Sequence, residues 1–494
     1  MTSTTSEMRS SRGLFAAEPG AGAFVIFLVL LLAFRLVLLA LSDTELYFDE
    51  AQYWAWSKQP AFGYYTKPPL LAWVIGLTTG VCGDSPFCAR LGAPLLHAAS
   101  ALVAYAIARK LFDRRIAFWT GIVYLTTPGA AVSAMLISTD VPLLFFWTVA
   151  LLATVHHVER PTWLTGAVIG IAIGLGMNAK YAMVYFVLCF ALYCAFEPRL
   201  RRLLVHPATL AALAIAALLI LPNVLWNAGH GFATFSHTRD NASWDNGRFP
   251  NISGMLEFIG TQAVIIGPVP FVALIVALLG RADFGKRAEL RLLLFFSIPV
   301  FALITLQALI AKANGNWAAT AFPAAAIAAT AVMVSLKWWR GMVFTLVLST
   351  VTTIAVPLST VFADRFTSGP IAGEMGKLRG WSTYADNVRR IAAATGIDTV
   401  VFCDRGLTAA MLYELRDSGL NIRRYTANPQ HPADHFQMTI PWTPSDARPV
   451  LIFVTHPYHM SAVETVAATP VETFDAEIYL AKRNGWKSTA YRVD

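Results

Sequence analysis

Charged residues are scarce in this 494-residue chain, where they make up 14% of the sequence. Soluble proteins carry about a quarter, and this chain is instead 56% hydrophobic. Its apolar residues gather in runs of roughly 17 to 22, which is long enough to cross a bilayer as helices. The composition therefore excludes a soluble globular enzyme and indicates a polytopic membrane protein.

Cysteine is also scarce, and five cysteines are too few for a disulfide scaffold or a metal cluster. Cys82 and Cys88 share one predicted outer loop, where they can form a local disulfide or serve as small apolar residues. A small-residue cleavage site is missing from the first apolar run, so we expect residues 22–41 to be an anchor and not a signal peptide.

The apolar runs predict roughly eleven membrane spans. These expected spans are 22–41, 91–109, 116–135, 141–157, 162–177, 181–196, 207–225, 257–280, 292–310, 318–336 and 341–361. The segment 69–81 is apolar but short for a span, so an interfacial or re-entrant helix suits it better.

The net charge of +8 does not mark a nucleic-acid surface, because the basic residues lie mostly in short loops between apolar runs. All these loops fall on one side of the expected topology, which the positive-inside rule makes cytoplasmic. Their basic residues are Arg9, Arg12, Lys110, Arg114, Arg115, Arg199, Arg201, Arg202, Arg281, Lys286, Arg287, Arg291, Lys337 and Arg340. The C-terminal tail then lies on the outer side of the membrane.

The last quarter of the chain differs in character. Residues 399–404 and 448–455 read as buried strands and 407–416 as a helix. We therefore expect an all-α membrane domain followed by a small α/β domain on the outer face that acts as a lid or docks the acceptor. The expected boundaries are a cytoplasmic tail at 1–21, a membrane domain at 22–362 with its first outer loop at 42–90, and the α/β domain at 363–494.

Unusual polar residues converge on the outer side of this topology. Each one alone can be a helix cap or a snorkelling lysine, but charges near a membrane are usually paired or functional. They are Asp49, Glu50, Lys67, Asp140, Asn178, Lys180, Asn223, Asn227, His230, His237, Lys312, Asn314, Asn316 and Trp317.

The first outer loop holds the densest group. On a structural interpretation, Asp49 caps a short helix and Glu50 lies in its first turn. On a functional one, Asp49 accepts a proton from an attacking hydroxyl or amine. Lys67 and Lys180 then hold a lipid-linked phosphate as point charges. The aromatic residues Tyr53, Trp54, Trp56, Tyr64 and Tyr65 either stack on a sugar ring or sit in the interfacial belt.

The ordered combination of these motifs resembles the GT-C superfamily of integral-membrane glycosyltransferases over about residues 20–340. The motifs are the Asp49-Glu50 pair after the first span, Tyr64-x-x-Lys67-Pro68-Pro69, Thr139-Asp140, Lys180 and Asn316-Trp317. The similarity is greatest to the bacterial branch of protein O-mannosyltransferase-like enzymes, lipid A aminoarabinose transferase and rhizobial galacturonosyltransferases.

The resemblance implies a role for each matching residue. Asp49 corresponds to the first-loop aspartate, the proposed catalytic base or acceptor-positioning group, with Glu50 beside it. Asp140 corresponds to the second essential aspartate. Lys67 and Lys180 correspond to lysines that contact the donor phosphate. The expected substrate-binding residues are Tyr64, Tyr65, Tyr53, His230 and Asn316. No metal ligand is assigned and no cofactor is certain, but a divalent metal stays open as a cofactor because the metal requirement varies among such enzymes.

Aminoarabinose transferases have Glu immediately before Lys-Pro-Pro, whereas this chain has Thr66, which argues against a cationic amino sugar. We expect an inverting transfer of a sugar from a polyprenyl phosphate to lipid A, lipopolysaccharide or another cell-envelope acceptor on the periplasmic face. The sequence also lacks a DxD-type motif placed for a nucleotide-sugar metal, which agrees with a lipid-phosphate donor. The alternative is a transporter or flippase of lipid-linked sugars, which predicts internal repeats and mid-membrane polar residues.

Overall fold

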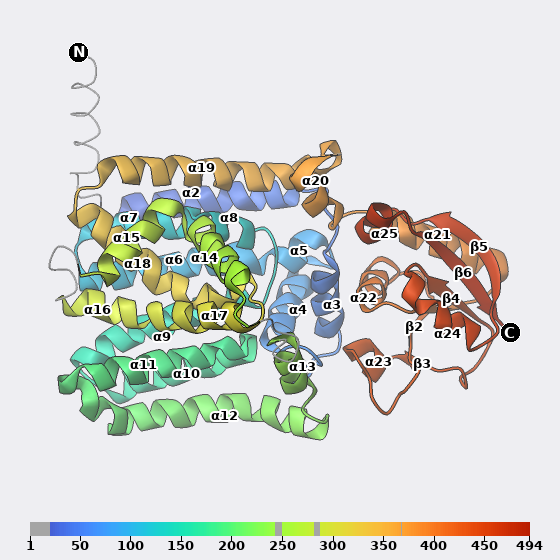
Figure 1. The fold of residues 1–494 in the computed structure, drawn as a ribbon, viewed down its shortest axis with the longest axis horizontal. Coiled ribbons are helices and arrows are strands. Elements are labelled where there is room, and N and C mark those ends of the chain that lie inside the picture. The colour runs from blue at the N-terminus through green and yellow to red at the C-terminus, as the bar shows by residue number, and fades with distance from the viewer. Residues whose placement is uncertain (1–19, 243–248, 281–286, 367) are drawn as a thin grey trace, which may run out of the picture. The chain divides into compact units, whose positions relative to one another are not determined.

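The computed structural model describes residues 20–242, 249–280, 287–366 and 368–494. The chain divides into two compact units (Figure 1). The helical unit contains residues up to 38 together with 67–71 and 90–357, and the α/β unit contains 39–66, 72–89 and 358–494. The N-terminal tail through residue 19 and the basic residues Arg9, Arg12, Arg281 and Lys286 lie outside the described residues.

The helical unit is built from apolar helices and three short 3-10 segments. Its helices are α2 (Ala21–Ala40), α6 (Gly92–Leu111), α7 (Arg114–Thr126), α8 (Pro128–Ser133), α9 (Asp140–Glu159), α10 (Trp163–Ala179), α11 (Val184–Phe196), α12 (Pro207–Gly229), α13 (Ala233–Ala242), α14 (Ile252–Ile266), α15 (Pro268–Leu278), α16 (Ala288–Phe295), α17 (Ile298–Ile310), α18 (Phe322–Ser335) and α19 (Trp339–Val361). The 3-10 segments are η1 (Tyr181–Met183), η2 (Pro198–Val205) and η5 (Gly315–Ala321).

Within the described residues, seven helices are long and apolar enough to cross a membrane, or eight if the bent pair α14 and α15 forms one span. The protein is thus a multi-pass membrane protein, while the count of eleven spans stays a prediction. The span expected at 257–280 is not one straight helix, because α14 and α15 are bent by 110° relative to each other. Gly267 breaks the helix there with a φ of +95°, and Pro268 then starts α15.

Small residues allow close helix packing in this unit. Almost every residue of the alanine-rich α18 is buried. Where α10 faces α12, glycine recurs at every fourth position, 166, 170 and 174. A β-carbon added at Gly166 or Gly170 would lie 2.3 or 2.5 Å from a backbone oxygen of α12. This is the small-residue spacing that brings membrane helices into backbone contact.

The α/β unit contains a six-stranded mixed sheet. Its strands are β1 (Thr399–Phe402), β2 (Asn421–Tyr425), β3 (Pro441–Trp442), β4 (Val450–Val454), β5 (Thr469–Asp475) and β6 (Lys487–Val493), in the order β3-β2-β1-β4-β6-β5. The four strands from β3 to β4 run parallel, and β6 pairs antiparallel with β4 and β5. The central strand β4 is apolar and fully buried, as a strand covered on both faces must be.

The described elements are completed by two 3-10 segments, η6 (Ala363–Arg365) and η7 (Pro457–His459), and by nine α-helices: α3 (Phe48–Ser57), α4 (Leu70–Cys82), α5 (Pro86–Arg90), α20 (Gly369–Gly376), α21 (Trp381–Thr395), α22 (Arg405–Glu414), α23 (His435–Thr439), α24 (Met460–Glu464) and α25 (Tyr479–Asn484). The two predicted strands and the predicted helix of this region are confirmed as β1, β4 and α22. The short apolar helix expected at 69–81 is α4, whose thirteen residues are too few for a span.

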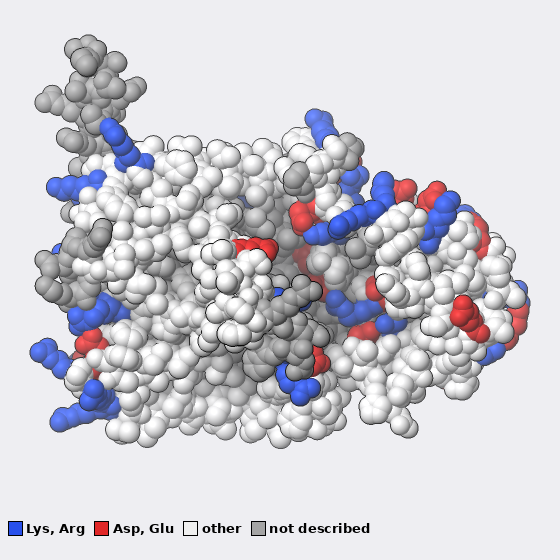
Figure 2. Space-filling model, viewed as in Figure 1, with Lys and Arg blue, Asp and Glu red and all other residues white. Residues whose placement is uncertain are grey.

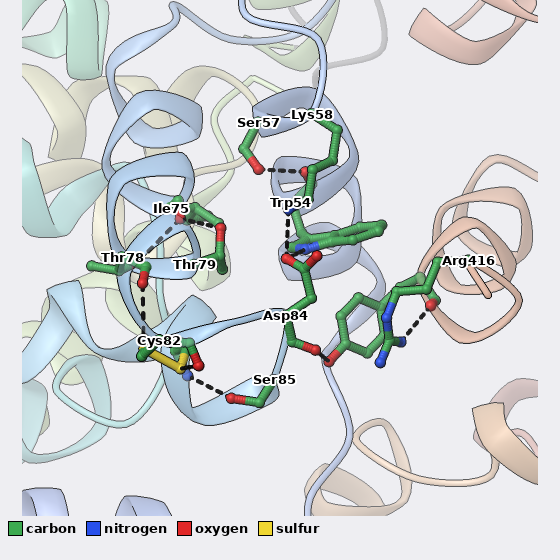
Figure 3. Close-up of polar contacts among 12 residues, drawn as sticks. Trp54, Ser57, Lys58, Ile75, Thr78, Thr79, Cys82, Asp84, Ser85 and Arg416 are labelled. Carbon is green, nitrogen blue, oxygen red and sulfur yellow. Dashed lines mark hydrogen bonds and ion pairs between the residues drawn. A yellow bond between two sulfur atoms is a disulfide. The ribbon is translucent and has the colours of Figure 1, made fainter.

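A cluster of polar contacts joins α3 to the loop after α4 (Figure 3). The Asp84 carboxylate accepts hydrogen bonds from Trp54 Nε1 at 2.7 Å and Lys58 Nζ at 2.5 Å. Burial would raise the pKa of Asp84, but the bonds from Lys58 and Trp54 outweigh it and leave the pKa below its ordinary value. Cys82 and Cys88 form a disulfide beside this cluster, which decides between the two interpretations of that pair.

The other three cysteines, Cys189, Cys194 and Cys403, are free and buried. Burial raises the pKa of the Cys403 thiol to about 12, so the thiolate that reacts with electrophiles is not populated near neutral pH.

Candidate active site

Asp140 is the centre of a buried polar cluster in the helical unit. Its Oδ1 accepts a hydrogen bond from Lys180 Nζ at 2.7 Å, and its Oδ2 accepts one from Asn316 Nδ2 at 2.7 Å. The side chains of Asp140 and Lys180 are only 10% and 19% exposed. The attraction between two opposite charges is stronger where water is largely excluded than in bulk water. Three residues predicted from distant parts of the sequence therefore meet.

Local structure places each of the three. Asp140 lies in the first turn of α9, where the helix dipole favours a carboxylate. Lys180 follows α10 as its C-terminal cap in an extended conformation, with its backbone N–H bonded to the Gly176 carbonyl. Asn316 comes from η5, directly before α18. Since α9 starts and α10 ends at this point, the cluster lies at one end of the helix bundle.

A cavity of about 410 Å³ opens beside the cluster, with Asp140 and Asn316 in its wall. Most of the remaining wall is apolar and comes from α8, α9, α14 and α18. Its other polar groups include His97 and Ser133, which are hydrogen bonded to each other at 2.9 Å. An apolar cavity with a few convergent polar groups at one edge suits an amphiphilic ligand.

Nearby amides that the sequence singled out are engaged in helix packing. Asn223 and Asn227 of α12 are fully buried, and both bond to the hydroxyl of Tyr181, at 2.7 and 3.3 Å. Asn178 bonds to a carbonyl of α10 and to the Leu219 carbonyl of α12. Tyr181 was not predicted, although its place directly after Lys180 was a signal. These contacts fix the end of α10 that carries Lys180.

His230, an expected substrate-binding residue, is exposed at the end of α12. Its Nδ1 lies 2.7 Å from the Trp226 carbonyl, and its ring stacks on the Trp226 indole. These contacts are local to one helical turn and give the residue no part in the Asp140 cluster.

Asp49, the expected base, lies in the α/β unit and is held by Arg405. The guanidinium donates to Asp49 Oδ1 at 3.0 Å and to Gln52 Oε1 at 2.6 Å. Burial lowers the pKa of Arg405, but the charge and hydrogen bond of Asp49 outweigh it, so its pKa lies above the ordinary value. The Asp49 side chain is 37% exposed, so it remains within reach of a substrate.

The structure corrects the capping interpretation of Asp49. The N-cap of α3 is Tyr47, and both Asp49 and Glu50 lie in the first turn. Glu50 is buried and its Oε2 accepts a hydrogen bond from the Tyr47 backbone N–H at 3.0 Å. Glu50 thus fixes the start of the helix, a structural role, and leaves Asp49 as the accessible carboxylate of the pair.

The three expected tyrosines are packed within the α/β unit. Tyr64 is buried, stacks on Trp56 at 4.6 Å and donates its hydroxyl to the Trp56 carbonyl, and burial raises its pKa to about 12. Tyr53 is buried with its ring 5.4 Å from that of Trp56. Tyr65 donates its hydroxyl to the Pro432 carbonyl at 2.8 Å. Through these contacts the three rings stabilise the fold of residues 42–90.

Lys67 is half-buried and belongs to the helical unit with Asp140 and Lys180. The predicted residues are thus divided between the two units. Arg405 was missed by sequence reasoning, since a basic residue at a helix start 356 positions from Asp49 gives no signal of pairing. In the described part of the chain, no group of three or more His, Cys, Asp or Glu side chains is arranged to hold a metal.

Comparisons with known proteins identify the family of this chain. A family model described as dolichyl-phosphate-mannose-protein mannosyltransferase matches residues 66–226. The lipid A galacturonosyltransferase RgtD of Rhizobium johnstonii is 34% identical over 437 residues, which cover 87% of this chain and 90% of that protein. The chain therefore belongs to the GT-C superfamily of integral-membrane glycosyltransferases, as its motifs predicted.

The chain is also similar to one further sequence and to one solved structure. An undecaprenyl phosphate-α-4-amino-4-deoxy-L-arabinose arabinosyl transferase of Pseudomonas savastanoi pv. phaseolicola is 28% identical over 163 residues, 32% of this chain and 30% of that protein. The crystal structure of ArnT from Cupriavidus metallidurans bound to undecaprenyl phosphate matches with a TM-score of 0.64 at 14% identity, over 96% of this chain and 98% of that one. The fold of the whole chain is thus the ArnT fold.

Proposed function

We propose that this protein transfers a sugar from a polyprenyl phosphate to lipid A or a related cell-envelope glycolipid. The observation that carries the proposal is the Asp140–Lys180–Asn316 cluster at the edge of an apolar cavity among membrane helices. The cavity suits an isoprenoid chain, and Lys180, which is bonded to Asp140 of the cavity wall, suits a phosphate. The RgtD and arabinosyl transferase relatives, whose names give lipid A or undecaprenyl phosphate, support the same substrates.

In the proposed reaction, the bond from the sugar's anomeric carbon to the phosphate oxygen breaks, and a bond to the acceptor oxygen forms on the opposite face. Asp49 takes the proton of the attacking acceptor hydroxyl as general base. Lys67 and Lys180 neutralise the phosphate as it leaves. An ammonium has three donors, and Asp140 occupies one of those on Lys180, so two remain for phosphate oxygens. Electrostatic stabilisation of the leaving group supplies much of the acceleration.

We also propose that the reaction takes place on the periplasmic side. The described basic residues between α6 and α7, α11 and α12, and α18 and α19 lie at one end of the helical unit, and Figure 2 shows blue side chains gathered at its left end. The positive-inside rule places that end in the cytoplasm. The Cys82–Cys88 disulfide supports an oxidising compartment for residues 42–90. In this assignment, residues 363–494 are a periplasmic domain.

The test is transfer of labelled sugar from a panel of polyprenyl-phosphate donors by purified protein in detergent, with lipid A as acceptor. Wild-type protein is expected to release polyprenyl phosphate and form glycosylated lipid A. Lys180→Gln is expected to lower the rate by roughly 100-fold, the order seen when one charge-stabilising donor is removed. The matched control is Lys110→Gln, since Lys110 also forms a 2.7 Å ion pair, with Glu159, but lies at the basic end of the unit.

Equal activity of Lys180→Gln and Lys110→Gln would contradict the proposed role of Lys180. Translocation of lipid-linked sugar across liposomes without any transfer would instead support the transporter alternative.

A further inference from the structure

A second cavity, of about 170 Å³, lies within the α/β unit and is distinct from the cavity beside Asp140. It lies at the carboxyl ends of β1 and β4, which are parallel neighbours in the sheet. From β1 the chain proceeds to β2 on one side, whereas β5 and β6 lie on the other side of β4. Such a reversal of strand order leaves a crevice at which open α/β sheets bind ligands.

Polar groups from both strand ends line this cavity. Asp404 follows β1 and caps α22, its Oδ1 accepting a hydrogen bond from the Leu407 N–H at 2.8 Å. Thr455 and His456 follow β4, and His459 lies in the next turn. His456 Nδ1 accepts a hydrogen bond from the Tyr458 N–H, so in the neutral ring its Nε2 carries the proton and donates. The residues at the two strand ends therefore supply the cavity with both hydrogen-bond acceptors and hydrogen-bond donors.

Aromatic rings form much of the remaining wall. They are Tyr47, Phe48, Trp381, Phe453, Tyr479 and Trp486. The Trp486 indole packs edge-on against the His456 ring, with 4.2 Å between the ring centroids. Gly406 lies against Phe48, and a β-carbon at this position would come within 3.2 Å of that ring. A larger residue would therefore crowd the cavity.

Two cations also line the cavity, but each is already balanced. Arg405 pairs with Asp49 at 3.0 Å, and Lys377 pairs with Glu374 at 2.7 Å. A site whose positive charges are neutralised has little to gain from a phosphate or a polyanion. Aromatic faces with hydroxyl-matching donors and acceptors instead fit a ring that has apolar C–H faces and a polar rim.

We propose that this cavity binds one uncharged pyranose ring of a glycan, stacked on the aromatic wall and hydrogen bonded to Asp404 and His456. Its volume is below the about 300–1,000 Å³ of sites for drug-sized ligands, which limits the occupant to about one ring. Such a site would give the α/β unit a saccharide-binding activity that does not depend on the transfer reaction.

The test is saturation-transfer NMR with the full-length protein in detergent and no lipid donor. The probes are the methyl glycosides of D-glucose, D-galactose and N-acetyl-D-glucosamine, beside D-galacturonate and inorganic phosphate. At least one neutral glycoside is expected to receive saturation and to bind in the millimolar range. Trp486→Ala is expected to weaken that binding at least tenfold.

Because Trp486→Ala removes packing, a second variant leaves the fold intact. Asp404→Asn keeps an N-cap, since Asn and Asp cap helices equally well, but loses a charged acceptor, so it is also expected to weaken binding. Phe362→Ala removes an exposed ring of the same unit that does not line the cavity, and it is expected to bind like wild type. Equal binding by all three variants would overturn the proposal, as would saturation of galacturonate or phosphate without any neutral glycoside.

Discussion

Lys180 and Asp140 illustrate how charges are kept at the end of a bundle of apolar helices. Neither side chain is more than a fifth exposed, and each is the counter-ion of the other. Removing one partner of such a pair leaves the other as an uncompensated charge, which costs several kcal/mol. The pair therefore holds the ammonium in one place, and Asn316 holds the carboxylate from its other side.

We expect Asp140→Asn to lower transfer by on the order of 10- to 100-fold and to destabilise the fold by several kcal/mol, because the amide keeps the shape of the carboxylate but no longer balances the charge of Lys180. The control is Asp113→Asn. Asp113 caps α7 by accepting a hydrogen bond from the Ile116 N–H, and asparagine caps equally well, so activity should be unchanged. Initial rates at saturating donor check both variants, and equal rates would refute the role of Asp140.

A carboxyl in the α/β unit makes its stability depend on pH. Burial raises the pKa of Glu414 to about 7, and Glu45 adds to the rise. Arg416 and Arg389 oppose the shift, while Asp386 adds to it. In the unfolded chain this carboxyl ionises near pH 4.5, so the folded state is penalised as the pH rises from about 4.5 to about 7. Stability should fall over that range and stay level above it.

Glu414→Gln is expected to remove this slope and to stabilise the protein at pH 8. One pKa unit is worth about 1.4 kcal/mol, and partial exposure of the side chain discounts the total to about 1–2 kcal/mol. Thermal unfolding in detergent between pH 4.5 and pH 8 measures the effect. The exposed Glu464, changed to Gln, serves as the control. If the stability of Glu414→Gln still falls between pH 4.5 and pH 7, the pH dependence arises from other groups.

At the residue scale, sequence reasoning found the members of the site better than their partners. Asp140, Lys180 and Asn316 were predicted because a charge or amide at the outer end of an apolar run is unusual, and the structure brings them together. The capping role of Asp49 was wrong because Tyr47 starts α3 and Glu50 satisfies its backbone N–H. Arg405 was missed because tertiary pairing leaves no local pattern.

At the scale of elements, the contact between α10 and α12 determines where Lys180 lies. Lys180 is the residue that ends α10, so the packing of that helix sets its position. Three glycines let α12 approach at backbone distance, and Asn178 bonds across to α12 near the same end. Helix position and site geometry are therefore linked through this contact.

We expect Gly170→Ala to destabilise the protein by about 1–3 kcal/mol, because its β-carbon would lie 2.5 Å from the Ala212 backbone oxygen and one helix must move. Gly260→Ala is the matched control in α14, since a β-carbon there meets nothing within 4 Å. Unfolding temperatures in one detergent compare the two. If both alanines have the same effect, the close approach is not needed for stability.

Helices and strands that carry their own local sequence signal were predicted well, whereas the bend between two helices was not predicted. The strands β1 and β4 are short buried runs, and α22 follows a capping Asp, so each carries its own local signal. The span expected at 257–280 is broken because one glycine and one proline outweigh an otherwise continuous apolar run. Composition detects the run, whereas the bend depends on two backbone angles.

At the scale of the whole molecule, the orientation proposed for the membrane puts the chain's C-terminus in the periplasm. Fusion of alkaline phosphatase after Asp494 is expected to be active, while a fluorescent-protein fusion that matures only in the cytoplasm is expected to be dark. The reverse pair of results would mean that the number of spans has the opposite parity and that the proposed outer face is cytoplasmic.

The cysteines of this protein make it suitable for spectroscopic labelling. Two are consumed by the Cys82–Cys88 disulfide, and the three free thiols are buried. In the native fold, a maleimide or nitroxide reagent should therefore react with a newly introduced surface cysteine in preference to any native one. Pairs of such labels, one in each compact unit, would report by dipolar spectroscopy how far apart the two units lie and how that distance responds to donor and acceptor.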